Sequence, residues 1–389
     1  MPNNFGEDLA FIKRFFSTQV LSNSDGATLF CVAELQGRTM TSSSNGNEGV
    51  SYGYINYANV EKGLVDPQIN LVGGEDRIWI SPEGGQYSVF FEPGSKDMDF
   101  ASWRTPPCID SEPFELIDTQ ADSLTYQKHS SVTNMSGFTF EFTLERKVTL
   151  LSRNAVVDGL DTDIPDSIQL AGYVSDNKIT NTSDTPWVHE TGLIGLWAIC
   201  MNPPAPNAVL MVPYKKGDDA ELGQIVTADY FGKLSGDRLK VDEELGLVFL
   251  RGDGDFRSKL GISHPRASSR LGSWNPETGV LSVVDFNLPE SAPAGYTNNL
   301  WIHQDDPFKG DVINAYNDGP NDSGGKLGGF FELETISPAL PLKKDESYTH
   351  TTRIVRFEGA RDQLDQMAQT LFGANLTQIE SALDKITAS

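Results

Sequence analysis

Two glutamates late in the chain have the spacing of a catalytic carboxylate pair. Glu332 and Glu334 lie two residues apart in a short strand-like segment, so both side chains project from the same face of the strand. On a face that lines a cleft, carboxylates this close raise the pKa of one of them, as a general base working near neutral pH requires. The alternative is a solvated strand edge on which both carboxylates lie in water.

His303 is the candidate proton donor. It follows Trp301 by two residues in the strand-like residues 298–304, so the two side chains are expected on one face. Asp305 and Asp306 come directly after this segment. An imidazole beside carboxylates titrates near neutral pH and can transfer a proton. The alternative is a structural histidine that is hydrogen bonded to a loop carbonyl.

An early arginine, Arg77, is the candidate ligand-binding cation. Glu83 and Gln86 follow it in a block that is dense in glycine and charged residues and is bounded by strand-like runs. Loops held by strands often carry binding groups, and a guanidinium can bind a carboxylate, a sulfate or a pair of hydroxyls. The alternative is a buried ion pair with Glu75, Asp76 or Glu83. Weaker candidates for the lining of the same site are Trp103, Asn314, Tyr316 and Lys309.

The charge of the chain limits its partners. Lys and Arg number 30 and Asp and Glu 54, which gives a formal net charge of −24. So negative a surface repels phosphate backbones and anionic lipid surfaces, and we expect no nucleic acid or membrane partner. Lys309, a cation in so acidic a chain, would help most with an anionic ligand.

No metal or cofactor motif is found. Two acidic runs, residues 158–163 and 251–255, lack both the ligand order of an EF-hand loop and a histidine at metal spacing. We expect solvated turns there and no cofactor, with calcium as a minor alternative. No Gly-x-Ser-x-Gly elbow, P-loop or dinucleotide fingerprint supports a hydrolase, NTPase or dehydrogenase. Cys31, Cys108 and Cys200 are odd in number and widely spaced, which favours buried free thiols.

The elements that must position these residues are mainly strands. Residues 137–150 alternate, with Phe138, Phe140, Phe142 and Leu144 on one face. Similar segments are expected at residues 169–174, 193–201, 208–212, 245–250, 280–287, 298–304 and 347–357. No repeat of 20 to 50 residues and no βαβ alternation occurs. The pattern therefore predicts an all-β, antiparallel fold.

Helices are expected at the two ends. Residues 8–16 have helical spacing behind an acidic first turn, within a helical segment at 1–20. A helical tail at 360–389 carries two apolar stripes that we expect to pack on their own domain. The first stripe is Leu364, Met367 and Leu371, and the second follows Asn375, the expected N-cap, through Leu376, Ile379, Leu383 and Ile386.

One domain is predicted over residues 1–389. The glycine-rich residues 317–329 lie between strand-like runs and are interpreted as a mobile hairpin tip rather than as a domain boundary. Apolar runs are too short to span a bilayer. The first residues contain no basic n-region and no apolar h-region. We therefore expect a cytoplasmic protein, or a periplasmic or secreted one if a leader has been removed.

The order of motifs in the last third of the chain resembles the galactose mutarotase-like superfamily, in a bacterial branch. The resemblance rests on the block at 310–319, the Leu-Glu-Thr strand and proline within 329–339, and the turn at 342–350. The block at 73–86 resembles the region in which the superfamily places a sugar-contacting arginine. The implied fold, over nearly the whole chain, is an antiparallel supersandwich of two large sheets with a sugar-binding cleft.

The resemblance also implies roles for single residues. Glu334 takes the place of the catalytic base and Arg77 that of the sugar-contacting arginine, while Trp301 is a candidate for stacking on the sugar. The family's general-acid histidine is out of register in residues 185–193, so His303 is the expected substitute.

Three functions follow for a saccharide-binding chain. The first is a cofactor-free acid/base enzyme whose nearest model is an aldose 1-epimerase. The second is a lyase or dehydratase acting on acidic, uronate-containing oligosaccharides. The third is a carbohydrate-binding protein without catalysis, which the out-of-register histidine keeps open.

Overall fold

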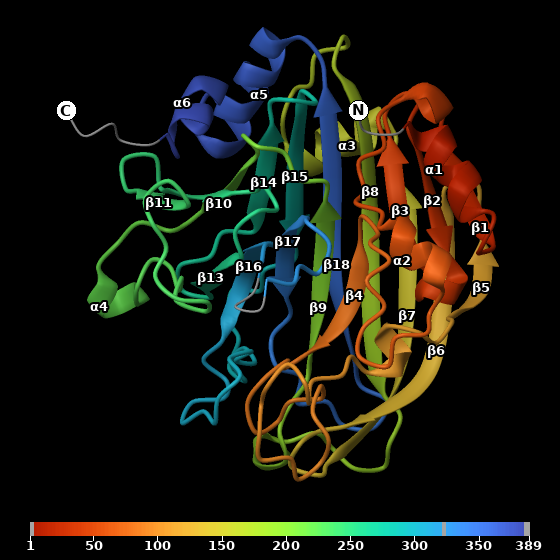
Figure 1. Cartoon of the computed structure of the whole chain (residues 1–389), viewed down its shortest axis with the longest axis vertical. Coiled ribbons are helices and arrows are strands. Elements are labelled where there is room, and N and C mark those ends of the chain that lie inside the picture. Colours follow the sequence, from red (N-terminus) through yellow and green to blue (C-terminus); the bar gives the residue numbers. More distant parts are fainter. Residues whose placement is uncertain (1–3, 321–323, 385–389) are drawn as a thin grey trace.

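The regular structure of the chain is mainly antiparallel strand, as predicted (Figure 1). The structure, a computed structural model, describes residues 4–320 and 324–384. Within these residues, no helix is both long and apolar enough to cross a membrane. Nothing tests the prediction of one domain over residues 1–389, which stays a prediction.

The larger layer is a ten-stranded sheet in the order β11-β12-β10-β14-β15-β18-β8-β7-β6-β5. Its strands are β5 (Glu115–Thr119), β6 (Ser123–Thr133), β7 (Thr139–Leu150), β8 (Gln169–Asn181), β10 (Val209–Pro213), β11 (Leu239–Asp242), β12 (Leu247–Arg251), β14 (Arg270–Asn275), β15 (Val280–Phe286) and β18 (Ser347–Glu358). The alternation expected over residues 137–150 is confirmed in β7, where Phe140, Phe142 and Leu144 are buried.

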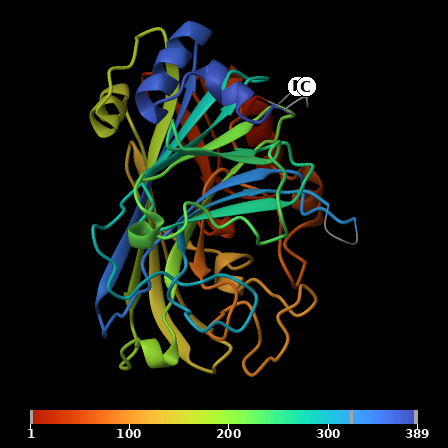
Figure 2. The same cartoon turned by 90° about the vertical axis from the view of Figure 1, so that its left-hand side faces the viewer.

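The second layer carries the candidate site residues. A five-stranded sheet has the order β13-β16-β17-β9-β4, and a three-stranded sheet has the order β1-β2-β3. The strands are β1 (Thr18–Ser22), β2 (Thr28–Val32), β3 (Arg38–Ser43), β4 (Arg77–Ser81), β9 (Gly195–Asn202), β13 (Ser258–Ser263), β16 (Asp311–Asn317) and β17 (Phe331–Ile336). A backbone bridge between Thr39 and Asp76 connects β3 to the start of β4. Figure 2 shows the strands of the five-stranded sheet crossing over those of the larger one.

Buried ion pairs connect the two layers next to β4. Arg146 on β7 pairs with Asp76, and Arg356 on β18 pairs with Glu75 at 2.9 Å. All four side chains are at most 1% exposed. Because a buried charge is costly without its partner, these pairs fix the segment directly before Arg77.

The helices of the C-terminal tail cover the outer face of the larger sheet. Leu364, Met367 and Leu371 pack in one cluster with β10, β12, β14, β15 and β18, as expected for a stripe that packs on its own domain. Asn375 is the N-cap of the last helix, as predicted, and makes a capping box with Gln378. The helices are α1 (Phe5–Ile12), α2 (Tyr57–Lys62), α3 (Arg153–Leu160), α4 (Asp219–Leu222), α5 (Arg361–Phe372) and α6 (Leu376–Ser381).

Several local predictions are wrong. The first helix begins earlier than the expected residues 8–16, because Asn4 and Glu7 form a capping box. Residues 18–20, the end of the expected helical segment, belong to strand β1. Residues 298–304 are not a strand. There the Gln304 side chain donates to the carbonyls of Asn298 and Leu300, in place of a neighbouring strand. The expectation that helices occur only at the chain ends missed α2, α3 and α4. Ile386 and the tip residues 321–323 lie outside the described residues.

The three cysteines are buried and free, as predicted.

Candidate functional site

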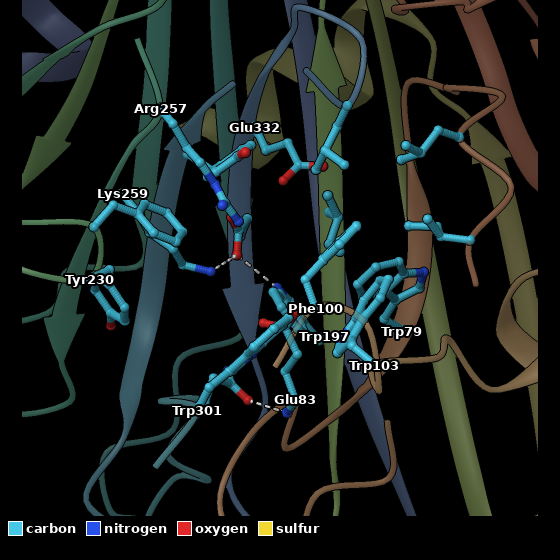
Figure 3. Close-up of a pocket in the computed structure, with 18 of the residues that line it drawn as sticks. Trp79, Glu83, Phe100, Trp103, Trp197, Tyr230, Arg257, Lys259, Trp301 and Glu332 are labelled. Atoms are coloured by element: carbon cyan, nitrogen blue, oxygen red, sulfur yellow. Dashed lines mark hydrogen bonds and ion pairs between the residues drawn. The ribbon is translucent and has the colours of Figure 1, made fainter. Parts of the chain in front are cut away.

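A cavity of about 270 Å³ opens on one face of the five-stranded sheet (Figure 3). Its walls are largely aromatic, and a small set of charged side chains lies among the rings. The aromatic side chains in the lining are Trp79, Phe100, Trp103, Trp197, Tyr230, Phe231, Trp301, Tyr316 and Phe330. The charged ones are Arg77, Glu83, Arg257, Lys259, Glu332 and Glu334. A concave apolar site with a few convergent polar groups is typical of a small-molecule binding site.

The register of the five strands explains why distant residues meet here. Glu334 on β17 lies opposite Ile199 on β9, which in turn lies opposite Arg77 on β4. Glu332, two residues earlier, lies opposite Tyr316 on β16, and Tyr316 lies opposite Lys259 on β13. Because side chains two residues apart share a face, these rows bring the charged groups to one surface.

Glu334 is held by two donors. Its Oε2 accepts hydrogen bonds from Trp197 Nε1 at 3.0 Å and from Lys259 Nζ at 3.2 Å (Figure 3). The side chain is 1% exposed. Burial lowers the pKa of the Lys259 ammonium, but nearby carboxylates, Glu334 first and then Glu83, outweigh burial and raise this pKa above its ordinary value. A charged ammonium therefore lies beside Glu334 at neutral pH.

Glu332 has a pKa suited to proton transfer near neutrality. Burial raises the pKa of Glu332 from 4.5 to about 7. The Arg77 guanidinium, whose Nη2 lies 3.0 Å from Glu332 Oε1, opposes this rise, whereas the charge of Glu334 adds to it. The sequence predicted that one carboxylate of the pair has a raised pKa, and this direction is found. The first cause is burial rather than the neighbouring charge.

Glu83 adds a third carboxyl group to the lining. Its backbone N–H donates to Asn299 Oδ1 at 2.8 Å, which fixes the turn after β4. Burial raises the pKa of Glu83, and the charge of Lys259 opposes this rise. Glu83 therefore resembles Glu332, because its carboxyl group also holds its proton more tightly than in water.

Arg77 combines the two interpretations given for it. It lines the cavity, and it also forms an ion pair, with Glu332 rather than with Glu75, Asp76 or Glu83. Its guanidinium lies 4.4 Å from the centroid of the Trp79 ring. This stacking and the ion pair hold the cation in place at the cavity wall.

Other predicted site residues lie outside the cavity lining. His303 is exposed, so the prediction that it faces the same cavity as Glu334 is wrong. Lys309 is exposed too and pairs with Asp306 at 2.8 Å. Gln86 bonds to the backbone of Gln304. Asn314 is buried and donates to the Leu260 carbonyl and to Tyr230. Among the predicted residues, Arg77, Glu83, Trp103, Trp301, Tyr316, Glu332 and Glu334 do line the cavity.

Two cations at the start of β13 and two aromatic residues of the lining were not predicted from the sequence. Arg257 and Lys259 are two residues apart and line the same cavity, and Trp197 and Tyr230 do so as well. The sequence contained a signal for the two cations, because Arg257 and Lys259 have the same two-residue spacing as the glutamate pair.

No group of three or more His, Cys, Asp or Glu side chains that could hold a metal ion is found within residues 4–320 and 324–384. The expectation of a site without a cofactor stays a prediction.

The chain matches one protein-family model over almost its whole length. A model described as a family of unknown function (DUF6786) matches residues 3–383. The chain belongs to this family. No curated protein matches this DUF6786 chain in sequence.

The chain is similar to several solved structures over most of its length. The Slr1438 protein from Synechocystis sp. PCC 6803 aligns with a TM-score of 0.50 and 13% identity, over 87% of this chain and 95% of that chain. A putative aldose 1-epimerase from Escherichia coli K12 aligns with a TM-score of 0.48 and 14% identity, over 88% and 100%. A galactose mutarotase-like protein from Lactobacillus casei ATCC 334 aligns with a TM-score of 0.46 and 11% identity, over 87% of this chain and 100% of that chain. The alignment with the Slr1438 protein concerns the fold alone and agrees with the predicted antiparallel fold, and an identity of 13% says nothing about the reaction.

Proposed function

We propose that this protein binds a saccharide in the aromatic cavity and catalyses proton transfer on it, with an aldose 1-epimerase as the nearest model for the reaction. The observation that carries the proposal is the buried carboxylate pair, Glu332 and Glu334, inside an aromatic cavity with two paired cations. Aromatic rings suit the apolar face of a sugar, and buried charged groups suit its hydroxyls.

Glu334 is the proposed base. Lys259 and Trp197 both donate to its Oε2, and within the described residues no hydrogen bond engages Oε1. That oxygen is the proposed acceptor of the proton of the anomeric hydroxyl. The ammonium of Lys259, beside Glu334, then stabilises the negative charge that develops on the hydroxyl oxygen as its proton leaves.

Glu332 is the proposed acid, in place of His303. Its raised pKa of about 7 lets Glu332 keep a proton close to neutral pH, as a general acid requires. In the proposed step, Glu334 takes the proton of the anomeric hydroxyl and Glu332 gives its proton to the ring oxygen. The bond between the anomeric carbon and the ring oxygen breaks at the same time. After rotation of the aldehyde, the same two protons move back as the ring closes on the other face.

The test is the rate of anomer exchange. Freshly dissolved α-anomers of glucose, galactose and their uronic acids are followed by ¹H NMR with the wild-type chain and with Glu334→Gln. We expect accelerated exchange of at least one sugar, and a loss of about 100-fold or more in the variant, because a general base contributes that much. Glu290→Gln, at an exposed position, is the matched control and keeps the wild-type rate.

Other outcomes separate the alternatives. Sugar binding without faster exchange would favour a binding protein. A conjugated product that absorbs ultraviolet light would favour a lyase, for which the comparisons give no support. Full turnover by a folded Glu334→Gln chain would remove Glu334 from the role of base.

A further inference from the structure

A second cavity adjoins the first. Its volume is about 720 Å³, and it shares Ile69, Leu71, Phe100, Arg257 and Leu327 with the lining of the smaller cavity. A ligand that occupies the smaller cavity can therefore continue into the larger one. Among the five shared residues, Arg257 alone is charged.

The charge of Arg257 is not neutralised by a neighbouring acid. Its guanidinium lies 4.0 Å from the centroid of the Phe231 ring. Within the described residues, no carboxylate comes within 4.0 Å of it, and its buried Nε has no hydrogen-bond partner. By contrast, Arg77 and Lys259, the other cations of the smaller cavity, are each paired with a glutamate.

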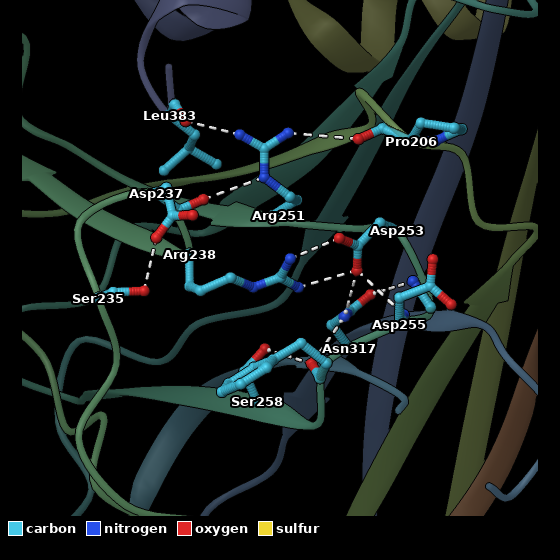
Figure 4. A network of polar contacts seen from close by, with 12 residues as sticks. Pro206, Ser235, Asp237, Arg238, Arg251, Asp253, Asp255, Ser258, Asn317 and Leu383 are labelled. Carbon is cyan, nitrogen blue, oxygen red and sulfur yellow. Dashed lines mark hydrogen bonds and ion pairs between the residues drawn. The ribbon is translucent and has the colours of Figure 1, made fainter. Parts of the chain in front are cut away.

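The acids close to Arg257 in the sequence are bound elsewhere (Figure 4). Asp253 accepts from Arg238, with Nη2 to Oδ1 at 2.8 Å, and from Asn317 at 3.1 Å. Asp255 pairs with Lys326 at 2.8 Å. Asn317 also donates to the Phe256 carbonyl at 2.9 Å. This network holds the segment before β13 in place and leaves Arg257 free to bind an anion.

The acids of the second cavity are likewise engaged by the protein. Asp318 accepts from the Tyr316 hydroxyl at 3.0 Å and from two backbone N–H groups at 2.8 and 2.9 Å. Asp66 Oδ1 accepts from the backbone N–H groups of Gln68 and Ile69. Lys62, a further cation of this lining, has no acidic partner within the part of the chain that the structure describes. An incoming anion therefore meets cations whose charge is available.

We propose that the second cavity receives an oxyanion substituent of the substrate, a carboxylate or a sulfate ester, and that Arg257 is the specificity-determining residue that binds it. This inference rests on the proposed function, since it concerns the part of the saccharide beyond the ring at Glu334. A guanidinium binds carboxylate and sulfate with two parallel hydrogen bonds, and stacking on Phe231 holds its plane.

The first experiment uses inorganic sulfate alone. The Nε–Hε signals of the arginines are followed by ¹H–¹⁵N NMR, and the Arg257 signal is assigned by its absence in Arg257→Met. We expect a saturable shift of this signal with sulfate, and none with sodium chloride of equal ionic strength. A signal that shifts no more than that of the exposed Arg361 would overturn the proposal.

The second experiment compares matched saccharides by calorimetry. Digalacturonate is paired with its neutral dimethyl ester, and a sulfated lactose with lactose. Arg257→Met should weaken binding of the anionic member of at least one pair by about 10-fold or more, and change binding of the neutral members little. The pair that responds identifies the carboxylate or the sulfate. Lys309→Met removes an exposed cation outside both cavities and is the control.

The outcomes also distinguish this inference from the proposed function. Equal weakening of neutral and anionic ligands by Arg257→Met, or equal affinity of the wild-type chain for both, would overturn the inference and leave the function of Glu334 intact. Binding of none of the four saccharides would count against both. Arg257→Lys keeps the charge without the two-pronged geometry, so its partial recovery of anion binding guards against a folding defect in the methionine variant.

Discussion

Replacement of Glu332 by glutamine tests the buried carboxylate pair through the stability of the chain. The pKa of Glu332 is raised from 4.5 to about 7, first by burial. A carboxyl with a higher pKa in the folded chain binds its proton more tightly there, so its contribution is most favourable below pH 4.5 and is lost as the pH rises towards 7. The difference between about 7 and 4.5, at 1.36 kcal/mol for each pH unit, corresponds to about 3 kcal/mol.

The assay is urea unfolding, followed by tryptophan fluorescence, from about pH 5 to about pH 8. Glutamine does not titrate, so the free energy of unfolding of Glu332→Gln, minus that of the wild type, should rise by about 2 to 3 kcal/mol over this range. Loss of the bond to Arg77 moves the whole curve but not its slope. Glu290→Gln, at an exposed position, should give a flat difference. A flat or falling difference for Glu332→Gln would refute a proton held by burial.

Two further predictions concern the cavity wall and the core. Trp301→Ala should weaken saccharide binding about 10-fold, because an aromatic contact is lost. His303→Ala should leave binding and turnover unchanged. Calorimetry measures the binding and anomer exchange the turnover, and a loss of either in the histidine variant would contradict the position of His303 outside the cavity. Arg146→Leu should cost about 3 to 5 kcal/mol of unfolding free energy, because it leaves Asp76 buried without its partner. Loss of the exposed pair of Lys344, by Lys344→Leu, should cost less than about 1 kcal/mol in the same urea assay.

Strand periodicity made part of the site predictable. The two-residue spacing of Glu332 and Glu334 fixes their common face, whatever the neighbouring strands are. Arg77 was recognised from its block of glycines and charges. Lys259 and Trp197 were missed because their place beside Glu334 depends on sheet order: β9 lies between β17 and β4, and β13 lies at the edge beyond β16. The order of the strands in the sheet cannot be predicted from residue spacing along one strand.

The prediction of a strand was wrong in a short segment in which side-chain hydrogen bonds replace those of a neighbouring strand. Residues 298–304 alternate like a strand, but the amide of Gln304 satisfies the carbonyls that a neighbouring strand would have bonded. For this reason His303 does not lie on a strand face beside Trp301, as had been predicted. The long β7 and the apolar stripe of α5 were predicted correctly, because several positions repeat the same period there.

The charges of the cavity differ in sign from those of the chain around it. The lining has three cations and three carboxyl groups, and two of the latter, Glu83 and Glu332, have raised pKa values. With a proton retained on Glu332, the lining is net positive, although the whole chain has a formal charge of −24. A low-dielectric cavity concentrates such a potential. The acid/base pair and the attraction for an anionic saccharide thus belong to one cavity, since a proton on Glu332 removes a negative charge from the lining in which Arg257 has no acidic partner within the described residues.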